Sequence, residues 1–213
     1  MPIGTIYHSG HVLLLARAAY GRSIASKSES EVCILLCAAA LEGFLNETAH
    51  AFSDAEESES AVALAEVLAE AESSHLSPVV KFRLAAFAVS GRFPRRGDLL
   101  IQRLTALVKL RNSLMHLKPE PIFTLDETHV LYEMPPKIPS EVAMLISDGA
   151  IKVPENFTGS WRQLVATPEV AKWAYTVAVD AMQWLTSAAN DVIVRERLEF
   201  QTQDLPEIGK NAG

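Results

Sequence analysis

The stretch "DLLIQRLTALVKLRNSLMHLKP" (residues 98–119) has the pattern of one long amphipathic helix that carries an arginine in its apolar stripe. Because an α-helix turns by about 100° per residue, Leu104 lies at about +40° and Leu107 at about −20° when Leu100 is set at zero. Arg111 then lies at about +20°, in the middle of the stripe. A guanidinium stays charged in a protein, and burying it without a partner is strongly unfavourable. Arg111 must therefore meet a carboxylate, a wet cleft or an anionic ligand.

Asn112 and His116 border the same stripe, at about 120° and about 160° in the same frame, one turn apart. One interpretation is structural: Arg111 forms a buried ion pair, and a cationic His116 is favoured by the helix dipole at the C-terminal end. The other is chemical. Arginine binds phosphate oxygens with a fork of donors, histidine transfers protons near neutral pH, and asparagine orients either of them. That set suits attack of a ribose 2′-OH on the neighbouring phosphodiester.

A second predicted helix, residues 29–52, has a matching irregularity. Glu42 and Asn46 lie within about 20° of the centre of its apolar stripe, among alanines. Small neighbours let another helix approach closely, and a buried glutamate needs a cation. A Glu42–Arg111 pair would satisfy both helices. The alternatives are that Glu42 faces a groove or pairs with Arg17.

Helix-forming patterns cover most of the chain and predict an all-α, up-and-down bundle. Asp98 is expected to cap the helix of the opening stretch, and an S-x-x-E capping box at residues 28–31 to begin the second helix. In the first helix, Leu14 and Ala18 are expected to face inward with Leu13 and Ala19. The predicted helices span residues 8–25, 29–52, 55–73, 78–90, 99–118 and 168–197.

The chain is read as a single domain over residues 1–205, followed by a flexible tail at 206–213. Residues 119–160 hold more than half of the prolines and little helical periodicity, so they are read as an irregular insertion before the last long helix. Within this insertion, residues 123–134 are compatible with a short hairpin and residues 139–149 with a short helix.

The composition, 49% hydrophobic and 21% charged over 213 residues, is that of an ordinary soluble globular protein. Cys33 and Cys37 lie in one apolar run and are expected to be core residues rather than half of a metal site. The N-terminal segment lacks the basic start of a signal peptide, and the longest uncharged apolar run, residues 32–41, is about half as long as a bilayer span. We therefore expect a cytoplasmic protein with no membrane contact, no cofactor and no metal.

Charge is distributed unevenly along the chain. The total is −7, but residues 81–118 contain nine basic residues and one acidic residue. This segment can offer a basic surface to an anion while the protein stays soluble. Its candidate RNA-backbone contacts are three arginines of the predicted loop "GRFPRRGD" and one lysine of the next helix: Arg92, Arg95, Arg96 and Lys109. The alternative is that these charges only balance the acidic helix predicted at 55–73.

The sequence "RNSLMH", residues 111–116, resembles the R-(polar)-x3-H signature of the HEPN superfamily, the all-helical domains of many RNases in toxin–antitoxin and antiviral systems. In that family the motif lies late in a helix of an up-and-down bundle. An earlier helix similar to "CAAALEGFLNETAH" (37–50), with an acid and an amide among small residues, is also typical of it. The resemblance covers residues 9–118 and the final helix, and it does not extend to the insertion.

The resemblance implies a metal-independent endoribonuclease that works as a homodimer, with two motifs meeting at the interface, in a defence, toxin–antitoxin or stress role. Arg111 would then bind and stabilise the scissile phosphate of RNA. His116 would be the general acid and base, and Asn112 would support this arrangement. Glu42 and Asn46 would be further supporting residues.

One position departs from a well-defined branch of the family. Toxins paired with a nucleotidyltransferase-type antitoxin carry a tyrosine two residues after the histidine, as the modification target, and here that position is Lys118. A different antitoxin or regulatory partner, or none, is therefore expected. Lys118 is either a further phosphate contact or a solvated lysine favoured by the helix dipole.

Two other interpretations stay open: a catalytically silent HEPN-like module that binds a nucleotide, RNA or a protein, and an unrelated bundle in which the motif is accidental. Catalysis requires Arg111 and His116 to be accessible in a shared cleft. In a silent module, Arg111 would be sealed against Glu42 and His116 would face bulk solvent.

Overall fold

The computed structural model describes residues 8–53, 58–116, 123–125, 131–133 and 137–202. Within these residues its regular secondary structure is helical apart from one short antiparallel hairpin, with Thr124 opposite Tyr132. The predicted all-α fold class is therefore confirmed, and a hairpin is present where residues 123–134 were compatible with one. The elements are α1 (Ser9–Ser23), α2 (Ser28–Ser53), α3 (Glu59–Ser73), α4 (Pro78–Ser90), α5 (Leu99–Met115), β1 (Phe123–Leu125), β2 (Leu131–Glu133), α6 (Ser140–Ser147), α7 (Trp161–Val165), α8 (Pro168–Ala188) and α9 (Val192–Thr202).

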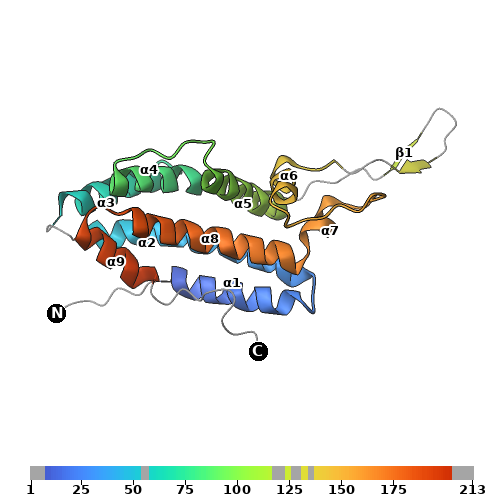
Figure 1. The fold of residues 1–213 in the computed structure, drawn as a ribbon, viewed down its shortest axis with the longest axis horizontal. Helices are drawn as coiled ribbons and strands as arrows, with labels where there is room; N and C mark the ends of the chain where they lie inside the picture. The colour runs from blue at the N-terminus through green and yellow to red at the C-terminus, as the bar shows by residue number, and fades with distance from the viewer. Residues whose placement is uncertain (1–7, 54–57, 117–122, 126–130, 134–136, 203–213) are drawn as a thin grey trace.

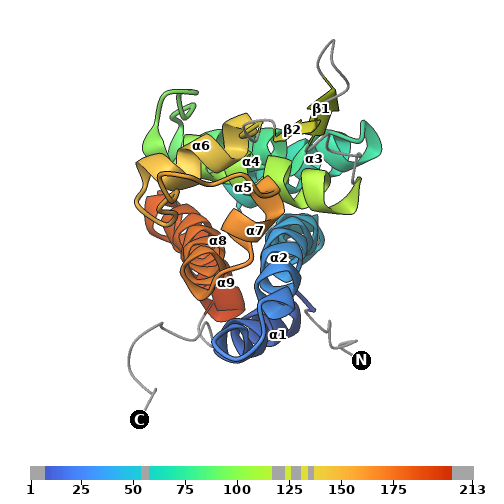
Figure 2. The same ribbon diagram turned by 90° about the vertical axis from the view of Figure 1, so that its right-hand side faces the viewer.

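Two helices, α2 and α8, lie side by side at the centre of the bundle (Figure 1). Figure 2, which looks along the bundle, shows α1 below this pair and α3, α4, α5 and α6 above it. α4 and α5 follow one another along the top of the molecule in Figure 1. α2 contacts α1, α3, α4, α5, α8 and α9. Any charged side chain on α2 can therefore meet partners from several helices at once.

The apolar composition of α2 explains its central position. Cys33, Ile34 and Leu41 are fully buried, and Phe44 is 1% exposed. By length and composition alone, the segment Ser28–His50 passes a test for a membrane-crossing helix, but half of its most apolar window is buried in the bundle. Core helices of this length pass the same test. The described contacts of α2 are those of a core helix.

The surface of α1 differs from the expectation that Leu14 and Ala18 face inward. Leu13, Ala16 and Ala19 are fully buried, whereas Leu14 is 47% exposed and Ala18 is exposed. The reason is that α1 packs mainly against α2 and α8, so its covered stripe is narrow.

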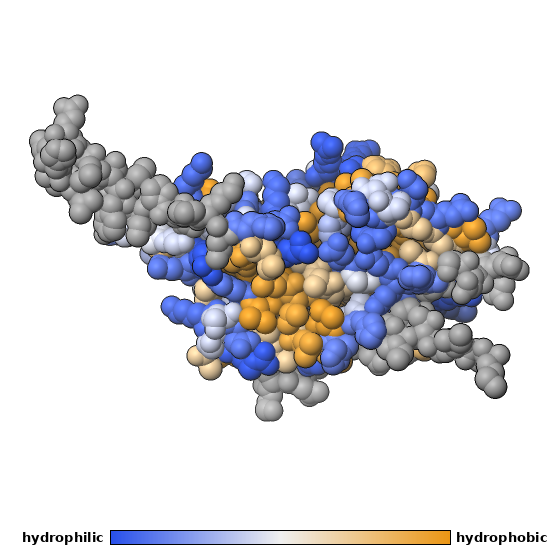
Figure 3. All heavy atoms as spheres, turned by 180° about the vertical axis from the view of Figure 1, so that it is seen from behind, coloured by the Kyte–Doolittle hydropathy of each residue, from blue (hydrophilic) through white to orange (hydrophobic). Residues whose placement is uncertain are grey.

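An apolar area is visible over α1 and α2 on the face of the molecule shown in Figure 3. On α2, Val32 and Ala39 are exposed and Leu35 and Leu36 are partly buried. Leu35, Ala39, Glu42 and Asn46 are spaced by four, three and four residues, which puts them on one stripe of the helix. The apolar area on α2 is therefore continuous with Glu42.

The junction between α4 and α5 is built by local hydrogen bonds. Ser77 caps α4 by accepting from the N–H of Val80 at 3.4 Å, and α4 ends at Gly91, whose φ of 67° is the left-handed conformation that glycine adopts at little cost. Asp98 precedes α5, but its carboxylate accepts from the N–H of Arg95 at 2.8 Å instead of capping the helix. Asp98 is therefore the N-cap residue by position, as predicted, but its side chain closes the loop and makes no capping hydrogen bond.

The predicted capping box at residues 28–31 is wrong. α2 does begin at Ser28, but the carboxylate of Glu31 is held by another helix. The Nη2 of Arg162, on α7, donates to both of its oxygens at 2.9 and 2.8 Å. A charge-assisted contact with a neighbouring helix has replaced the local cap.

The last long helix, predicted as continuous over 168–197, is two helices. α8 ends at Ala188, and Ala189 has an extended backbone, with ψ of 119°. The N–H of Asn190 donates to the carbonyl of Val89 in α4 at 3.0 Å. Asp191 then begins α9 by accepting from the N–H groups of Ile193 and Val194 at 2.8 and 3.2 Å. The adjacent Asn190 and Asp191 are the sequence signal for this break, because both residue types favour N-cap positions.

We expect Asp191→Ala to destabilise the protein by about 1 kcal/mol at pH 7, the usual cost of losing an N-cap. Hydrogen bonds from the hydroxyl of Ser58 and the N–H groups of Val194 and Ile193 hold the pKa of Asp191 below its ordinary value. A lowered folded-state pKa contributes stability that is present above the ordinary value of about 3.9 and is lost as the pH falls through the folded value. The difference between wild type and Asp191→Ala in urea unfolding should therefore shrink below about pH 4. Asp191→Asn, which keeps a capping side chain, should lose less stability at pH 7 than Asp191→Ala. A difference that stays constant with pH would contradict this account.

Candidate functional site

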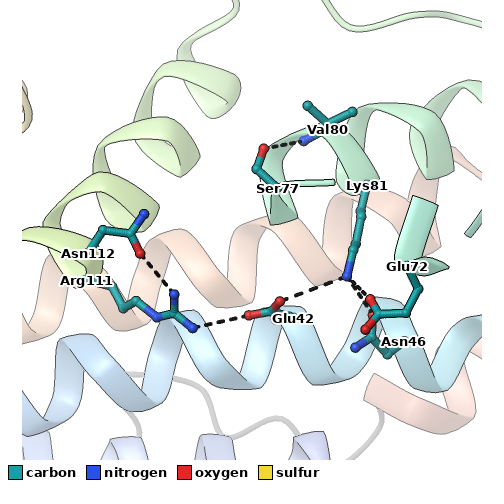
Figure 4. Close-up of polar contacts among 8 residues, drawn as sticks. All are labelled: Glu42, Asn46, Glu72, Ser77, Val80, Lys81, Arg111 and Asn112. Carbon is teal, nitrogen blue, oxygen red and sulfur yellow. Dashed lines mark hydrogen bonds and ion pairs between the residues drawn. The ribbon is translucent and has the colours of Figure 1, made fainter. Parts of the chain in front are cut away.

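Arg111, on α5, forms an ion pair with Glu42 of α2 (Figure 4). Its Nη2 lies 3.4 Å from Oε2 of Glu42, and its Nη1 donates to Oδ1 of Asn112 at 2.9 Å. The pair expected from the apolar stripes of the two helices is therefore present. The side chains of Arg111 and Glu42 remain 38% and 33% exposed, so the pair lies at the edge of the bundle and is not sealed in the core.

Lys81 of α4 is part of the same cluster, and the sequence reasoning missed it. It is 2% exposed. Its Nζ lies 3.9 Å from Oε1 of Glu42, donates to Oδ1 of Asn46 at 3.2 Å and contacts the carboxylate of Glu72 at the end of α3. Asn46 therefore supports Lys81 and has no described contact with Arg111. The sequence signal for Lys81 was its position one turn before Ala85, in the apolar stripe of α4. Arg111 interrupts the apolar stripe of α5 in the same way.

Four side chains thus form a line of alternating charge, which we call the charged row: Arg111, Glu42, Lys81 and Glu72. They come from four helices, α5, α2, α4 and α3, and Figure 4 shows Glu42 between the two cations. Because the signs alternate, the nearest neighbours of each charge in the row carry the opposite charge. The row ties the upper helices to α2 at its exposed edge.

His116 is exposed at the C-terminal end of α5. Its backbone has left the helical conformation (φ −117°, ψ 58°), and its N–H still donates to the carbonyl of Asn112 at 2.9 Å. Five residues along a helix correspond to a rotation of about 140°, so the Cα–Cβ directions of Arg111 and His116 differ by about that angle. One copy of the chain therefore does not direct both side chains toward the same point.

A groove of about 630 Å³ lies between α4, α5 and α6, and we call it the α4–α6 groove. Its charged and polar lining includes Arg83 of α4, Arg96 of the α4–α5 loop, Lys109 and Asn112 of α5 and Glu141 of α6. Asn112 is the link to the charged row, because it accepts from Arg111. Two of the predicted RNA-contacting residues, Arg96 and Lys109, therefore share one cavity with a residue of the motif.

The other two predicted contacts lie elsewhere. Arg92 and Arg95 line a separate hollow with Asp98 and Trp184. Both arginines are exposed. Lys118 lies outside the residues that the structure describes. The four basic residues predicted as one RNA-binding group therefore belong to two surfaces.

Metal binding has no candidate in the described part of the chain, which holds no group of three or more His, Cys, Asp or Glu side chains placed to bind an ion. Cys33 and Cys37 are both buried and form no disulfide, and their sulfur atoms lie 3.8 Å apart, within hydrogen-bonding distance. Burial is the main cause that raises the pKa of the Cys37 thiol well above its ordinary value. Cys37 is therefore an inert core residue and not a thiolate ligand.

Comparison with known families, with curated proteins and with solved structures found no match for this chain. Its function must therefore be inferred from its own residues and their geometry.

We expect Glu72→Gln to lower the free energy of unfolding by about 1–3 kcal/mol, because it removes a carboxylate from a nearly buried ammonium group. The matched control is Glu66→Gln, an exposed position on the same helix, with an expected change within about 0.5 kcal/mol. Both variants remove one negative charge, so urea unfolding of the pair separates the local contact from net charge. Equal effects in the two variants would show that Lys81 does not depend on Glu72.

Proposed function

We propose that this chain is a metal-independent endoribonuclease of the HEPN type, with a defence, toxin–antitoxin or stress role. The observation that carries the proposal is the state of Arg111. It is held at the edge of the bundle by Glu42 and Asn112, yet its side chain is 38% exposed. A phosphate can therefore reach a guanidinium whose direction is already fixed, which is the condition for recognising a phosphodiester with paired donors.

Glu42 does not have to be left unpaired when Arg111 turns to a phosphate. Its other oxygen lies 3.9 Å from Nζ of Lys81, which remains in place. The contact of Glu42 with Arg111, at 3.4 Å, is at the long end of hydrogen bonding. Exchange of this carboxylate for a phosphate oxygen is therefore inexpensive for the fold.

The proposed reaction is a transesterification. The 2′-OH attacks the adjacent phosphorus, the bond from phosphorus to the 5′-oxygen breaks, and the products end in a 2′,3′-cyclic phosphate and a 5′-OH. One base must take the proton of the 2′-OH and one acid must give a proton to the leaving oxygen. His116 is the one group of the motif suited to either transfer near neutral pH, and Arg111 stabilises the charge that develops on the phosphorane.

A second copy of the chain is part of the proposal. A single copy supplies one histidine where two proton transfers are needed, and its Arg111 and His116 point in different directions. The apolar stripe of α2 that carries Leu35 and Ala39 runs directly to Glu42, so a partner docked on this stripe would lie beside Arg111. A homodimer joined at this surface would bring two motifs together.

The Arg111–Glu42 pair also favours one other function, a catalytically silent module that binds RNA, a nucleotide or a protein. In that case the pair serves to hold α5 against α2. The two functions make opposite predictions for RNA cleavage.

We expect the purified protein to cleave total RNA in excess chelator and to leave 2′,3′-cyclic phosphate and 5′-OH ends. His116→Ala should lower the rate by about 10²–10⁴, the usual contribution of a general acid or base. Arg111→Ala should lower it by about 10²–10³, as for other groups that stabilise transition-state charge. The rate is measured on a labelled oligoribonucleotide.

The controls for this experiment are His11→Ala, an exposed histidine on α1, and Arg22→Ala, whose arginine forms an exposed pair with Glu29 at 2.8 Å. Both should cleave at the wild-type rate. Arg111→Ala should remain folded, because exposed pairs contribute about 0–1 kcal/mol. Absence of cleavage by the wild type, or equal cleavage by all variants, would favour the silent module.

We expect the wild type to be a dimer in light scattering coupled to gel filtration, and Val32→Glu combined with Ala39→Glu to be a folded monomer with much reduced cleavage. Two buried carboxylates at an apolar interface are strongly unfavourable. The control is Val192→Glu, an apolar position that is 62% exposed at the start of α9, where it should leave the dimer intact. A monomeric wild type that cleaves RNA would contradict the shared site.

A further inference from the structure

The α4–α6 groove has a charge arrangement that the fold does not use. The side chains of Arg96 and Lys109 make no hydrogen bond or ion pair with any described residue, and both residues are exposed. Their ammonium and guanidinium groups remain available at the rim of a cavity. Neither is needed to hold a helix in place, so both can be removed without an expected loss of stability.

Arg83 of α4 also lines the groove, and its guanidinium is held by the α4–α5 loop. Its Nε donates to the carbonyl of Pro94 at 3.0 Å, and its guanidinium lies 4.3 Å from the centre of the Phe93 ring. These contacts use one donor and one face of the group, and they leave its two terminal nitrogens without a partner among the described residues. A guanidinium held in this way is preorganised for an anion.

The single carboxylate in the lining of the groove accepts its hydrogen bonds from hydroxyl groups. Glu141 is 8% exposed, and it accepts from the hydroxyl of Ser113 at 2.6 Å and from that of Ser140 at 3.2 Å. It is not paired with a cation of the groove. The three basic residues are therefore not compensated by their neighbour, and an anionic ligand would meet a net positive rim.

The rest of the groove is apolar. Val80 of α4 is 36% exposed in its wall, and Ile101 of α5 and Met144 of α6 contribute further apolar surface. A ligand that fills the groove therefore has two parts, an anionic part at the rim and a flat or apolar part between the helices. The volume of about 630 Å³ is in the usual range for small-molecule sites, which is large enough for one nucleotide.

We infer that the α4–α6 groove seats an unpaired nucleotide of a single-stranded RNA, with the phosphates on Arg83, Arg96 and Lys109 and the base against the apolar wall. This inference rests on the proposed function for its choice of ligand. A base can enter the groove only when it is out of a duplex, so the substrate class is single-stranded RNA. Asn112 joins the groove to Arg111, so the strand leaves the groove toward the proposed scissile phosphate.

Binding is tested without cleavage. The probe is a fluorescently labelled oligomer of about twelve nucleotides, the length scale of single-strand sites, with 2′-O-methyl groups that remove the attacking hydroxyl. The wild-type protein should bind it, with an affinity that falls steeply with salt. The same oligomer annealed to its complement should bind at least about tenfold more weakly, because its bases are not free to enter the groove.

Two matched pairs of variants locate the binding. Arg96→Ala combined with Lys109→Ala should weaken binding about tenfold or more, whereas Arg92→Ala combined with Arg95→Ala, which removes the same charge from the neighbouring hollow, should change it less than about threefold. Val80→Glu places a carboxylate in the groove, and Val80→Gln is its neutral counterpart. Both complete an S-x-x-E/Q capping box with Ser77, so both should fold, and only Val80→Glu should lose binding.

The outcomes separate this inference from the nuclease. Binding with this pattern in a protein that never cleaves RNA would leave the groove assigned and refute the endoribonuclease. Cleavage that depends on His116 without any loss of binding in the groove variants would overturn the groove and leave the nuclease in place. Equal binding of single-stranded and duplex probes, equal effects of the Arg96/Lys109 and Arg92/Arg95 double variants, or no RNA binding at all would each overturn the inference.

Discussion

The polar edge of this bundle depends on one group, the carboxylate of Glu42. Two neighbouring helices place a cation in an otherwise apolar stripe, Lys81 on α4 and Arg111 on α5. Both cations meet the same carboxylate of α2, at 3.9 and 3.4 Å. α2 can serve both because it contacts nearly every other helix and because its stripe turns from apolar to polar at Glu42. The positions of α4 and α5 over α2 are thus fixed by charge as well as by packing.

Much of the fold could be predicted from the sequence because its helices are long, periodic and separated by proline, glycine or serine. The all-α class and the main helices follow from that pattern. The capping errors occurred where the side chain expected to cap a helix found another partner. Glu31 and Asp98 have the right residue types for caps, but one is held by Arg162 of α7 and the other by a backbone N–H of its own loop. The break before Asp191 was missed because apolar spacing continues across it.

The candidate site could be predicted in part. The pairing of Glu42 with Arg111 follows from the two helical stripes alone, since each charge needs a partner on the side where the other lies. Lys81 could have been found by the same reasoning applied to α4. The division of the basic residues between two surfaces could not, because it depends on where the α4–α5 loop folds back. Periodicity does not describe a loop, and Arg95 and Arg96 are adjacent in sequence but line different cavities.

The sharing of Glu42 has a consequence for how this sequence can change over time. A substitution that removes the carboxylate takes one partner from each of two cations in a single step, and leaves Lys81 with Glu72 and Asn46 and Arg111 with Asn112. A change at 81 or at 111 alone leaves Glu42 with one cation and is milder. Neutral drift should therefore proceed first at the two cations and last at the acid between them. In a set of related chains, position 42 would vary only together with both of the others.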